Sequence, residues 1–324
     1  MSAGIIPGIH HITVVAGDPQ RNLDFYGGAL GLRLVKTTVN FDAPDVYHLY
    51  YGDEVGHPGT ILTFFPFPDA PKGRRGSGTV DAVAFSVPSA SLDYWRGRLA
   101  EYGVAVGAPE TRFGEQVLLF ADPDGLRLEL IAHDEDGRRG WAGGPVPAEC
   151  MVRGFHGATP LVGDAGPTAR LLTGTMGFRS IGEEGGRVRY ATGDGGPGAE
   201  VDLVAAPGTP RGAVAAGIAH HIAWRVSDDA SERRWRPELG AQGLDVTSVR
   251  DRAYFRSIYF HEPGGILFEI ATDPPGFTVD EDVAALGSGL KLPPWLESRR
   301  KELEGALPPL HRPTSAAPVS QGAS

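Results

Sequence analysis

Two histidine doublets and one glutamate in an apolar run are the residues of this chain best suited to chemistry. His10–His11 opens the run HHITVV, His220–His221 opens HHIAWRV, and Glu269 lies within GILFEIATD. Successive side chains of a strand point to opposite faces, so the two rings of a doublet cannot both share one face. The first histidine of each doublet shares its face with large apolar residues, and the second with small or polar ones. The second histidine, His11 or His221, is therefore the better candidate for lining a cavity.

Glu269 is the natural third member of this set. Phe268 and Ile270 point to the packed side of its strand, which leaves Glu269 on the opposite face. Burying an unpaired carboxylate costs several kcal/mol, so such a group is expected to be paired or bound to a metal. Two imidazoles and one carboxylate form the facial triad that leaves coordination positions open for substrate and O2. This donor set favours Fe(II), with Mn(II) as the next choice.

Tyr259 and Arg252 lie close to this set in the sequence. The short HEPGG connection predicts a hairpin in which Glu269 lies opposite Ser257, with Tyr259 as a diagonal neighbour on the same face. Tyr259 can then reach the open side of the metal as a hydrogen-bond donor or weak ligand. Arg252 can supply positive charge near a bound phenolate.

The residues alone leave one ligand position open. His156, in GFHGATP, begins a comparable run and competes with His11 for that position. Asp81 and Glu129 make a second, degenerate site conceivable. Taken singly, each of these residues is compatible with a structural role, and the same doublet on two equivalent strands is what favours a metal site. Five further histidines lie in turns or at the ends of elements and are expected to be solvent-exposed: His48, His57, His133, His261 and His311.

Four stretches of the chain share one pattern, in which a β-rich run, a helix-like run and further β-rich runs follow each other. Such an internal repeat determines the fold class, which we expect to be α+β with four βαβββ modules. We expect one domain of two modules over residues 1–140, a Gly- and Pro-rich linker over 141–152 and a second domain of two modules over 153–280. Residues 281–324 are expected to hold one short helix, roughly Pro294 to Gly305, followed by a disordered tail.

The composition excludes several classes of partner. The chain has 324 residues, of which 41% are hydrophobic and 22% charged, with 46 Gly and 27 Pro, as expected for a globular protein rich in turns. A net charge of −10 argues against nucleic acid and anionic membranes as partners. Cys150 is the single cysteine, so no internal disulfide can form, and no apolar run is long enough to span a membrane. We expect a cytoplasmic protein that acts on a small molecule, either as a monomer or as a homo-oligomer.

The repeats resemble the vicinal oxygen chelate superfamily, which includes glyoxalase I, extradiol dioxygenases and antibiotic-resistance binding proteins. More specifically, GIHHITVVAGDPQRNLDFYGGALGLRLVKTTVNFDAPDVYHLYYGD, DRAYFRSIYFHEPGGILFEIATDPPGF and LPPWLESRRKELE resemble the ring-cleaving dioxygenases that act on hydroquinones. This resemblance extends to about residue 310 and implies two glyoxalase-like domains whose modules form open, cup-shaped mixed sheets.

The resemblance also implies a site and a reaction. It implies Fe(II) bound by His11, His221 and Glu269, which favours His11 over His156. Around the substrate it places the residues His10, Thr13, His220, Arg252 and Tyr259. The implied reaction is insertion of both atoms of O2 into a hydroquinone- or catechol-type ring. The alternatives within the superfamily are a glyoxalase-like isomerase or lyase using Zn(II) or Ni(II), and a metal-free small-molecule binding protein.

Overall fold

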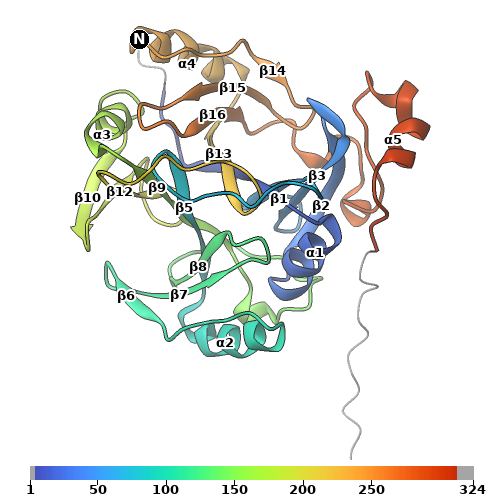
Figure 1. Cartoon of the computed structure of the whole chain (residues 1–324), viewed down its shortest axis with the longest axis horizontal. Coiled ribbons are helices and arrows are strands. Elements are labelled where there is room, and N and C mark those ends of the chain that lie inside the picture. Colours follow the sequence, from blue (N-terminus) through green and yellow to red (C-terminus); the bar gives the residue numbers. More distant parts are fainter. Residues whose placement is uncertain (1–3, 312–324) are drawn as a thin grey trace, which may run out of the picture.

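The computed structural model describes residues 4–311, which form two curled mixed sheets of eight strands each (Figure 1). In the first sheet the strand order is β14-β15-β16-β13-β1-β4-β3-β2. Its two central strands, β1 and β13, are antiparallel to each other, and each has a parallel neighbour on its outer side. The strands of this sheet are β1 (Ile9–Ala16), β2 (Arg33–Asn40), β3 (Ala43–Gly52), β4 (Ile61–Pro66), β13 (Ile218–Val226), β14 (Arg250–Asp251), β15 (Arg256–His261) and β16 (Leu267–Thr272).

The second sheet repeats this topology with the order β10-β11-β12-β9-β5-β8-β7-β6. Its central antiparallel pair is β5 and β9, and β8 and β12 are their parallel neighbours. The strands are β5 (Thr79–Val87), β6 (Glu110–Arg112), β7 (Glu115–Ala121), β8 (Arg127–Ala132), β9 (Gly154–Val162), β10 (Arg179–Glu184), β11 (Arg187–Ala191) and β12 (Glu200–Ala205).

The expected four βαβββ modules and the α+β fold class are confirmed, since each module contributes one helix and four strands. The sheets, however, combine modules that are not consecutive along the chain. The first sheet takes its strands from residues 9–66 and 218–272, and the second from residues 79–205. Our proposed division of the chain at residues 141–152 separates two pairs of consecutive modules, and each sheet draws one module from each pair.

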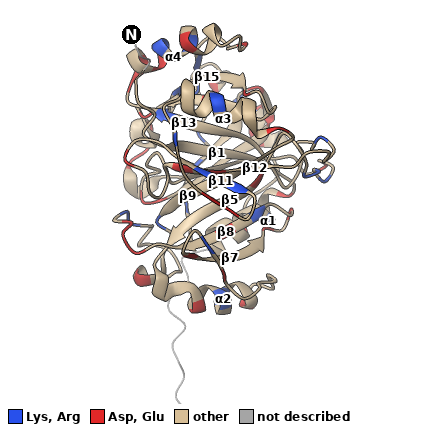
Figure 2. Ribbon diagram, turned by 90° about the vertical axis from the view of Figure 1, so that its left-hand side faces the viewer, with Lys and Arg blue, Asp and Glu red and all other residues tan. Residues whose placement is uncertain are grey.

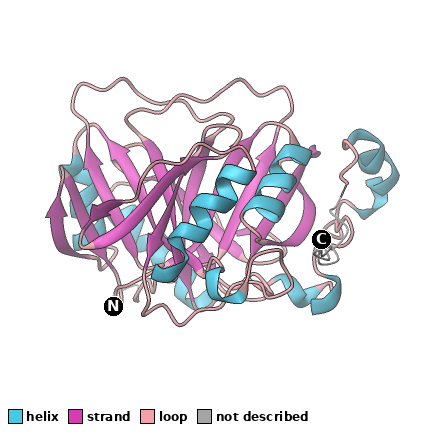
Figure 3. Cartoon of the chain, turned by 90° about the horizontal axis from the view of Figure 1, so that it is seen from below, coloured by secondary structure: helices cyan, strands magenta, loops and turns pink. Residues whose placement is uncertain are grey.

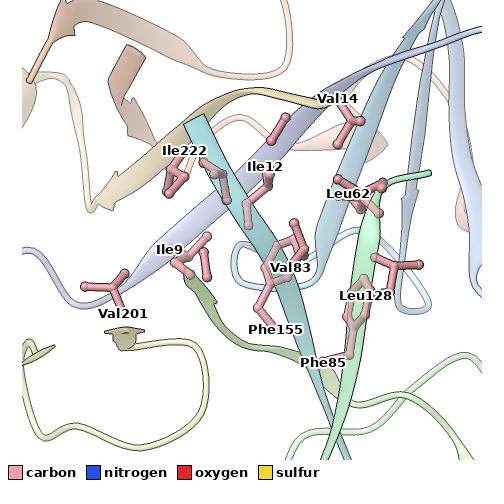
Figure 4. Packing of buried hydrophobic residues seen from close by; sticks show 14 of the residues in the cluster. Ile9, Ile12, Val14, Leu62, Val83, Phe85, Leu128, Phe155, Val201 and Ile222 are labelled. Carbon is pink, nitrogen blue, oxygen red and sulfur yellow. The ribbon is translucent and has the colours of Figure 1, made fainter. Parts of the chain in front are cut away.

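The hydrophobic core lies between the two sheets (Figure 4). Ile12 of β1 and Ile222 of β13 belong to the same buried cluster as Val83 and Phe85 of β5 and Phe155 of β9. Burying a side chain of this size contributes about 1.5–3 kcal/mol. The alternation of the strands then turns the other face of β1 and β13 away from this core, and that face carries the candidate ligands.

Four of the helices cover the sheets, and three of them begin at an aspartate whose side chain accepts a hydrogen bond from a backbone N–H of the first turn. In Figure 1, α4 lies beyond one end of the stacked sheets and α2 beyond the other, and Figure 3 shows helices lying across the strands. These helices are α1 (Pro19–Leu23), which continues into a π-helical turn (Asp24–Ala29), α2 (Leu92–Glu101), α3 (Ala165–Gly174) and α4 (Asp229–Ala241).

The C-terminal segment packs beside β2 and β3 rather than joining either sheet (Figure 1). Its helix α5 (Arg300–Ala306) begins later than the expected Pro294, because the preceding residues form a separate 3₁₀ turn. The expected disordered tail includes residues 312–324, which lie outside the described residues. The 3₁₀ turns of the chain are Ser89–Ser91, Ala148–Cys150, Phe277–Val279, Val283–Ala285 and Glu297–Arg299.

Acidic and basic residues are scattered over the helices, strands and loops of the chain (Figure 2). Across residues 4–311, no helix has the length and apolar character that crossing a bilayer requires.

Candidate metal centre

His11, His221 and Glu269 meet at one point on three adjacent strands of the first sheet. Nε2 of His11 lies 3.1 Å from Nε2 of His221. Oε2 of Glu269 lies 3.4 Å from the first of these nitrogens and 2.9 Å from the second. Two ligands that bind one ion at about 2.1 Å and at right angles lie about 3 Å apart. The three separations therefore match a facial set of ligands on one divalent cation.

The state of the carboxylate supports this match. Glu269 is fully buried, and neither of its oxygens accepts a well-directed hydrogen bond among the described residues, although both imidazoles are close. Burial would raise the pKa of Glu269, but the neighbouring His11 and His221 outweigh it and hold that pKa well below its usual range. An ionised, buried carboxylate that faces two imidazole nitrogens is a donor set that suits a cation.

The first histidine of each doublet orients the second. Nδ1 of His10 lies 2.8 Å from Nδ1 of His11, and the same contact of 2.8 Å joins His220 to His221. Burial and the adjacent histidine lower the pKa of both His10 and His220, the latter to about 3, so both rings are neutral at pH 7. Each can accept a hydrogen bond at Nδ1 from the Nδ1–H of the ligand ring beside it, which leaves Nε2 of that ligand ring to the metal.

Two β-bulges explain why both rings of a doublet reach the same region. The pairing of β1 with β13 shifts by one residue between Ile9 and His11 and again between Thr13 and Val14. The extra residue at the first shift is His10, and at the second it is His220. The strict alternation used in the sequence analysis placed these two rings on the packed face, and this expectation is wrong because a bulge turns its extra residue out of alternation.

His11 and His221 line a cavity of about 340 Å³, and the fully buried Glu269 contacts both of these rings. This volume is within the usual range for a small-molecule site. Of the five residues expected around the substrate, Thr13, His220, Arg252 and Tyr259 line this cavity, and His10 lies behind His11 and against Phe255. Aromatic side chains supply much of the remaining wall: Phe41, Phe65, Phe67 and Phe255.

Tyr259 lies directly opposite Glu269 in the β15–β16 hairpin, and Ser257 lies opposite Ala271. The expected register, with Ser257 opposite Glu269, is wrong because the connection spans residues 262–266, one residue further along the chain than assumed. The observed register brings Tyr259 closer to the ligands than a diagonal position would, and the centroid of its ring lies 5.9 Å from that of the His221 ring.

Arg252 is held in the cavity wall by two partners. Its Nε donates a hydrogen bond of 3.0 Å to the Tyr259 hydroxyl, and its Nη1 lies 3.1 Å from a carboxylate oxygen of Asp42 in the β2–β3 turn. Burial and the nearby Glu269 raise the pKa of Tyr259, so its hydroxyl keeps its proton at neutral pH. The cavity therefore offers one fixed cation and one neutral hydroxyl beside the ligand set.

The sequence analysis missed His48, which was expected to be solvent-exposed. His48 is only 9% exposed, lies within β3 and lines the cavity. His48 lies within the apolar, strand-like run VYHLYYG, and this pattern could have indicated that the residue is buried. Of the other four histidines, His57, His261 and His311 are exposed as expected, and His133 is partly buried.

The second sheet has no equivalent ligand set. Glu129 lies opposite Ala84 as Glu269 lies opposite Ala223, and the corresponding strand pairs place Gly157 where the first sheet has His11, and Ala82 where it has His221. His156 falls on a bulge equivalent to that of His10 and not at the position of His11, contrary to expectation.

Arginines neutralise the carboxylates of this second sheet. Glu129 pairs with Arg112 at 2.9 Å, and Asp81 pairs with Arg75 and Arg127. The associated cavity is about 10 Å³, roughly the space of one water.

His156 joins a separate cluster in the second sheet. Its Nε2 lies 2.9 Å from Oε1 of Glu115, which lies at the same distance from Nδ1 of His133. The other Glu115 oxygen accepts a hydrogen bond of 2.8 Å from Arg189. Burial raises the pKa of Glu115, but these partners together lower it to about 2. The structure thus places His156 with Glu115 rather than with His221 and Glu269.

Known proteins of similar sequence and structure share this fold over nearly their whole length. The model of the Glyoxalase/Bleomycin resistance protein/Dioxygenase superfamily matches residues 8–130 and 156–279. The chain is 47% identical over 302 residues to "Putative ring-cleaving dioxygenase MhqO" of Bacillus subtilis, covering 93% of this chain and 96% of that protein. It is 38% identical over 307 residues to the chlorohydroquinone/hydroquinone 1,2-dioxygenase of Sphingobium indicum, covering 92% and 95%.

The crystal structure of a "putative dioxygenase" from Bacillus subtilis superimposes with a TM-score of 0.91 at 46% identity, covering 95% of this chain and 98% of that one. Glyoxalase I of Zea mays shares the fold at a TM-score of 0.62 and 13% identity, covering 82% and 92%. The repeated modules, the two curled sheets and these matches together show that the chain belongs to the Glyoxalase/Bleomycin resistance protein/Dioxygenase superfamily.

Proposed function

We propose that this protein is a ring-cleaving dioxygenase that inserts both atoms of O2 into a small aromatic diol of the hydroquinone or catechol type. The observation that carries the proposal is the convergence of His11, His221 and Glu269, at separations of 2.9–3.4 Å, beside an aromatic-lined cavity whose wall includes both histidines. Relatives named for ring cleavage and for hydroquinone dioxygenation support this choice of reaction and substrate class.

The three ligands would hold Fe(II), with Mn(II) as the alternative. The bound metal would supply coordination positions for the substrate hydroxyl and O2, together with electron transfer between them. The cleavage would be of the extradiol type, beside a metal-bound hydroxyl. The protein would work as a cytoplasmic enzyme, either as a monomer or as a homo-oligomer.

The side chains around the cavity have distinct tasks in this proposal. The neutral His220 ring, whose Nδ1 faces His221, would carry its proton on Nε2 and act as a general acid that donates this proton to a substrate oxygen. General acid–base help of this kind is typically worth about 10²–10⁴-fold in rate. His10 is shielded from the cavity by His11 and acts by orienting that ligand.

Arg252 and Tyr259 act on charge. The guanidinium stabilises negative charge that develops on substrate oxygens, and the Tyr259 hydroxyl donates a hydrogen bond on the same side. The aromatic wall of Phe255 and Phe65 contacts the faces of the ring and excludes water from the ligand set.

The test is metal analysis of protein purified without oxygen, followed by O2 uptake with a panel of hydroquinones and catechols. We expect about one iron per chain, one O2 consumed per ring cleaved, and both atoms of ¹⁸O2 in the product. Incorporation of a single oxygen atom would contradict dioxygenation. Turnover of a glutathione hemithioacetal by the Zn(II)- or Ni(II)-loaded protein, with no O2 uptake on any diol, would point to the isomerase activity instead.

A further inference from the structure

A row of hydroxyl-bearing side chains continues from the candidate ligands across the floor of the first sheet. In the strand pairing, His221 of β13 lies opposite Thr13 of β1, Thr13 lies opposite Thr63 of β4, and Thr63 lies opposite Tyr50 of β3. Directly paired residues point to the same face of a sheet, so the whole row faces the cavity side. His48 is two residues from Tyr50 on the same strand and shares this face.

These side chains form one continuous hydrogen-bonded chain. The hydroxyls of Thr13 and Thr63 lie 2.8 Å apart, Nε2 of His48 lies 2.9 Å from the Thr63 hydroxyl, and Nδ1 of His48 lies 2.8 Å from the Tyr50 hydroxyl. Thr13, His48 and Tyr50 line the cavity, whereas Thr63 is fully buried beneath it.

The hydrogen bonds of this row can point in either of two directions. Burial and the nearby His11 lower the pKa of His48 well below its usual range, so the ring is neutral and one of its two nitrogens carries a proton. If Nε2 carries the proton, the donors run from Tyr50 toward Thr13, and if Nδ1 carries it, they run the other way. Depending on the direction, either the Thr13 or the Tyr50 hydroxyl keeps a proton for a group in the cavity.

The equivalent positions of the second sheet carry different side chains and, in the described part of the chain, line no comparable cavity. The same register places Asp202 at the position of Thr63 and Arg189 at that of Tyr50, and these two form a buried ion pair of 2.7 Å. Arg187, at the position of His48, donates a hydrogen bond to Thr159, at the position of Thr13. Ion pairs thus fill the space on the second sheet, whereas neutral hydroxyl and imidazole groups line an open cavity on the first.

The span of the row fits a particular arrangement of hydroxyls. The strand of Tyr50 lies two strand spacings from that of His11 and Thr13, about 10 Å along the sheet and less across its curved face. A metal–oxygen bond, a ring with hydroxyls at opposite ends and one hydrogen bond together bridge such a distance. The second hydroxyl of a catechol is adjacent to the first and remains beside the metal.

We propose that Tyr50 is the residue that binds the distal hydroxyl of a para-diol, held in place by His48 and Thr63, and that this row makes the enzyme select hydroquinones. The proposal rests on the ring-cleaving function proposed above. Tyr50 would contact the substrate, whereas His48 and Thr63 would act as positioning residues.

The test compares ligands that differ in the distal hydroxyl alone. Affinities for hydroquinone, phenol and catechol are measured without oxygen on the Mn(II)-loaded protein, for wild type, Tyr50→Phe, Thr63→Val and Tyr51→Phe. Tyr51 is the matched control, because it is the next residue of β3, is equally buried and donates its hydrogen bond to Asn22 on the opposite face. Metal content of each variant is measured in parallel.

We expect wild type to bind hydroquinone more tightly than phenol, and Tyr50→Phe to lose about five- to tenfold in hydroquinone affinity with phenol and catechol unchanged within twofold. Thr63→Val should shift the same ratio in the same direction with full metal content, and Tyr51→Phe should leave it unchanged. Equal losses for hydroquinone and phenol, or an unchanged ratio in Tyr50→Phe, would overturn the proposal. Absence of ring cleavage by wild type would refute the proposed function, whereas the affinity ratio judges the role of Tyr50.

Discussion

Replacing Glu269 by Gln tests whether this residue is a metal ligand or only a buried carboxylate that pairs with two histidines. The substitution keeps the shape of the side chain and removes the one carboxylate of the ligand set. A metal present at 100 times its dissociation constant stabilises the wild type by about 2.7 kcal/mol. Removing an indirect partner of a metal ligand already weakens metal binding 10–100-fold, so a lost ligand costs at least that much. At a 100-fold loss the same metal concentration stabilises the variant by only about 0.4 kcal/mol.

The assay is the rise in melting temperature when Mn(II) is added to chelator-treated protein. At about 1.5 °C per kcal/mol for a chain of this length, wild type should gain about 4 °C and Glu269→Gln about 0.6 °C. The measurement is the shift on adding metal, so any change in the metal-free baseline cancels.

Glu129→Gln is the matched control, because Glu129 occupies the equivalent position of the second sheet and pairs with Arg112. Breaking that buried pair should lower the baseline, at a cost of about 3–5 kcal/mol, and leave the Mn(II) shift intact. The reasoning is refuted if Glu269→Gln keeps the wild-type shift, or if wild type shows none.

Three further outcomes are expected. His11→Ala should lose both iron and ring cleavage, whereas His156→Ala should keep both; iron analysis and O2 uptake would reveal the reverse pattern if His156 were the ligand. Tyr259→Phe should keep its iron and turn over more slowly, and unchanged kcat and KM would remove this hydroxyl from the reaction. Glu232 of α4 is fully buried with no hydrogen-bond partner among the described residues, and burial raises its pKa from 4.5 to about 7. The folded state therefore holds this proton more tightly than the unfolded chain, and the resulting stability, complete below pH 4.5, is lost as the pH rises through 7. At pH 8 the unfolding free energy of Glu232→Gln should exceed that of wild type by on the order of 1–3 kcal/mol, and at pH 4.5 the two should be about equally stable. Equal stability at pH 8 would contradict the assignment.

The repeat of four modules was readable from the sequence because hydrophobic periodicity and turn residues are local properties. The choice of His11 and His221 over their neighbours also followed from local alternation, and the structure brings both to Glu269. Alternation could not reveal the bulges at His10 and His220, because a bulge depends on the partner strand and leaves no mark in the strand that carries it.

The burial of His48 was not predicted for a related reason. Its burial depends on Thr63 and Phe65 of the neighbouring strand β4, which contact its ring, and the sequence around His48 does not state which strand will lie beside it. Whether His11 or His156 is the third ligand likewise depends on which modules share a sheet. No local signal states that the first module pairs with the fourth, and the family resemblance supplied that information.

The pairing of the first module with the fourth has a consequence for the order of events during synthesis. All strands of the second sheet lie within residues 79–205, so that sheet can be completed while the chain is still growing. β1 must wait for β13, about 200 residues later, and His11 meets Glu269 only after β16 has emerged. Domains fold largely as they are synthesised, and closing so long a loop carries an entropic cost that a finished neighbouring sheet reduces. The second sheet can therefore be complete before the first, and the candidate ligand set, which needs strands from both the first and the fourth module, can form only after β16 is available.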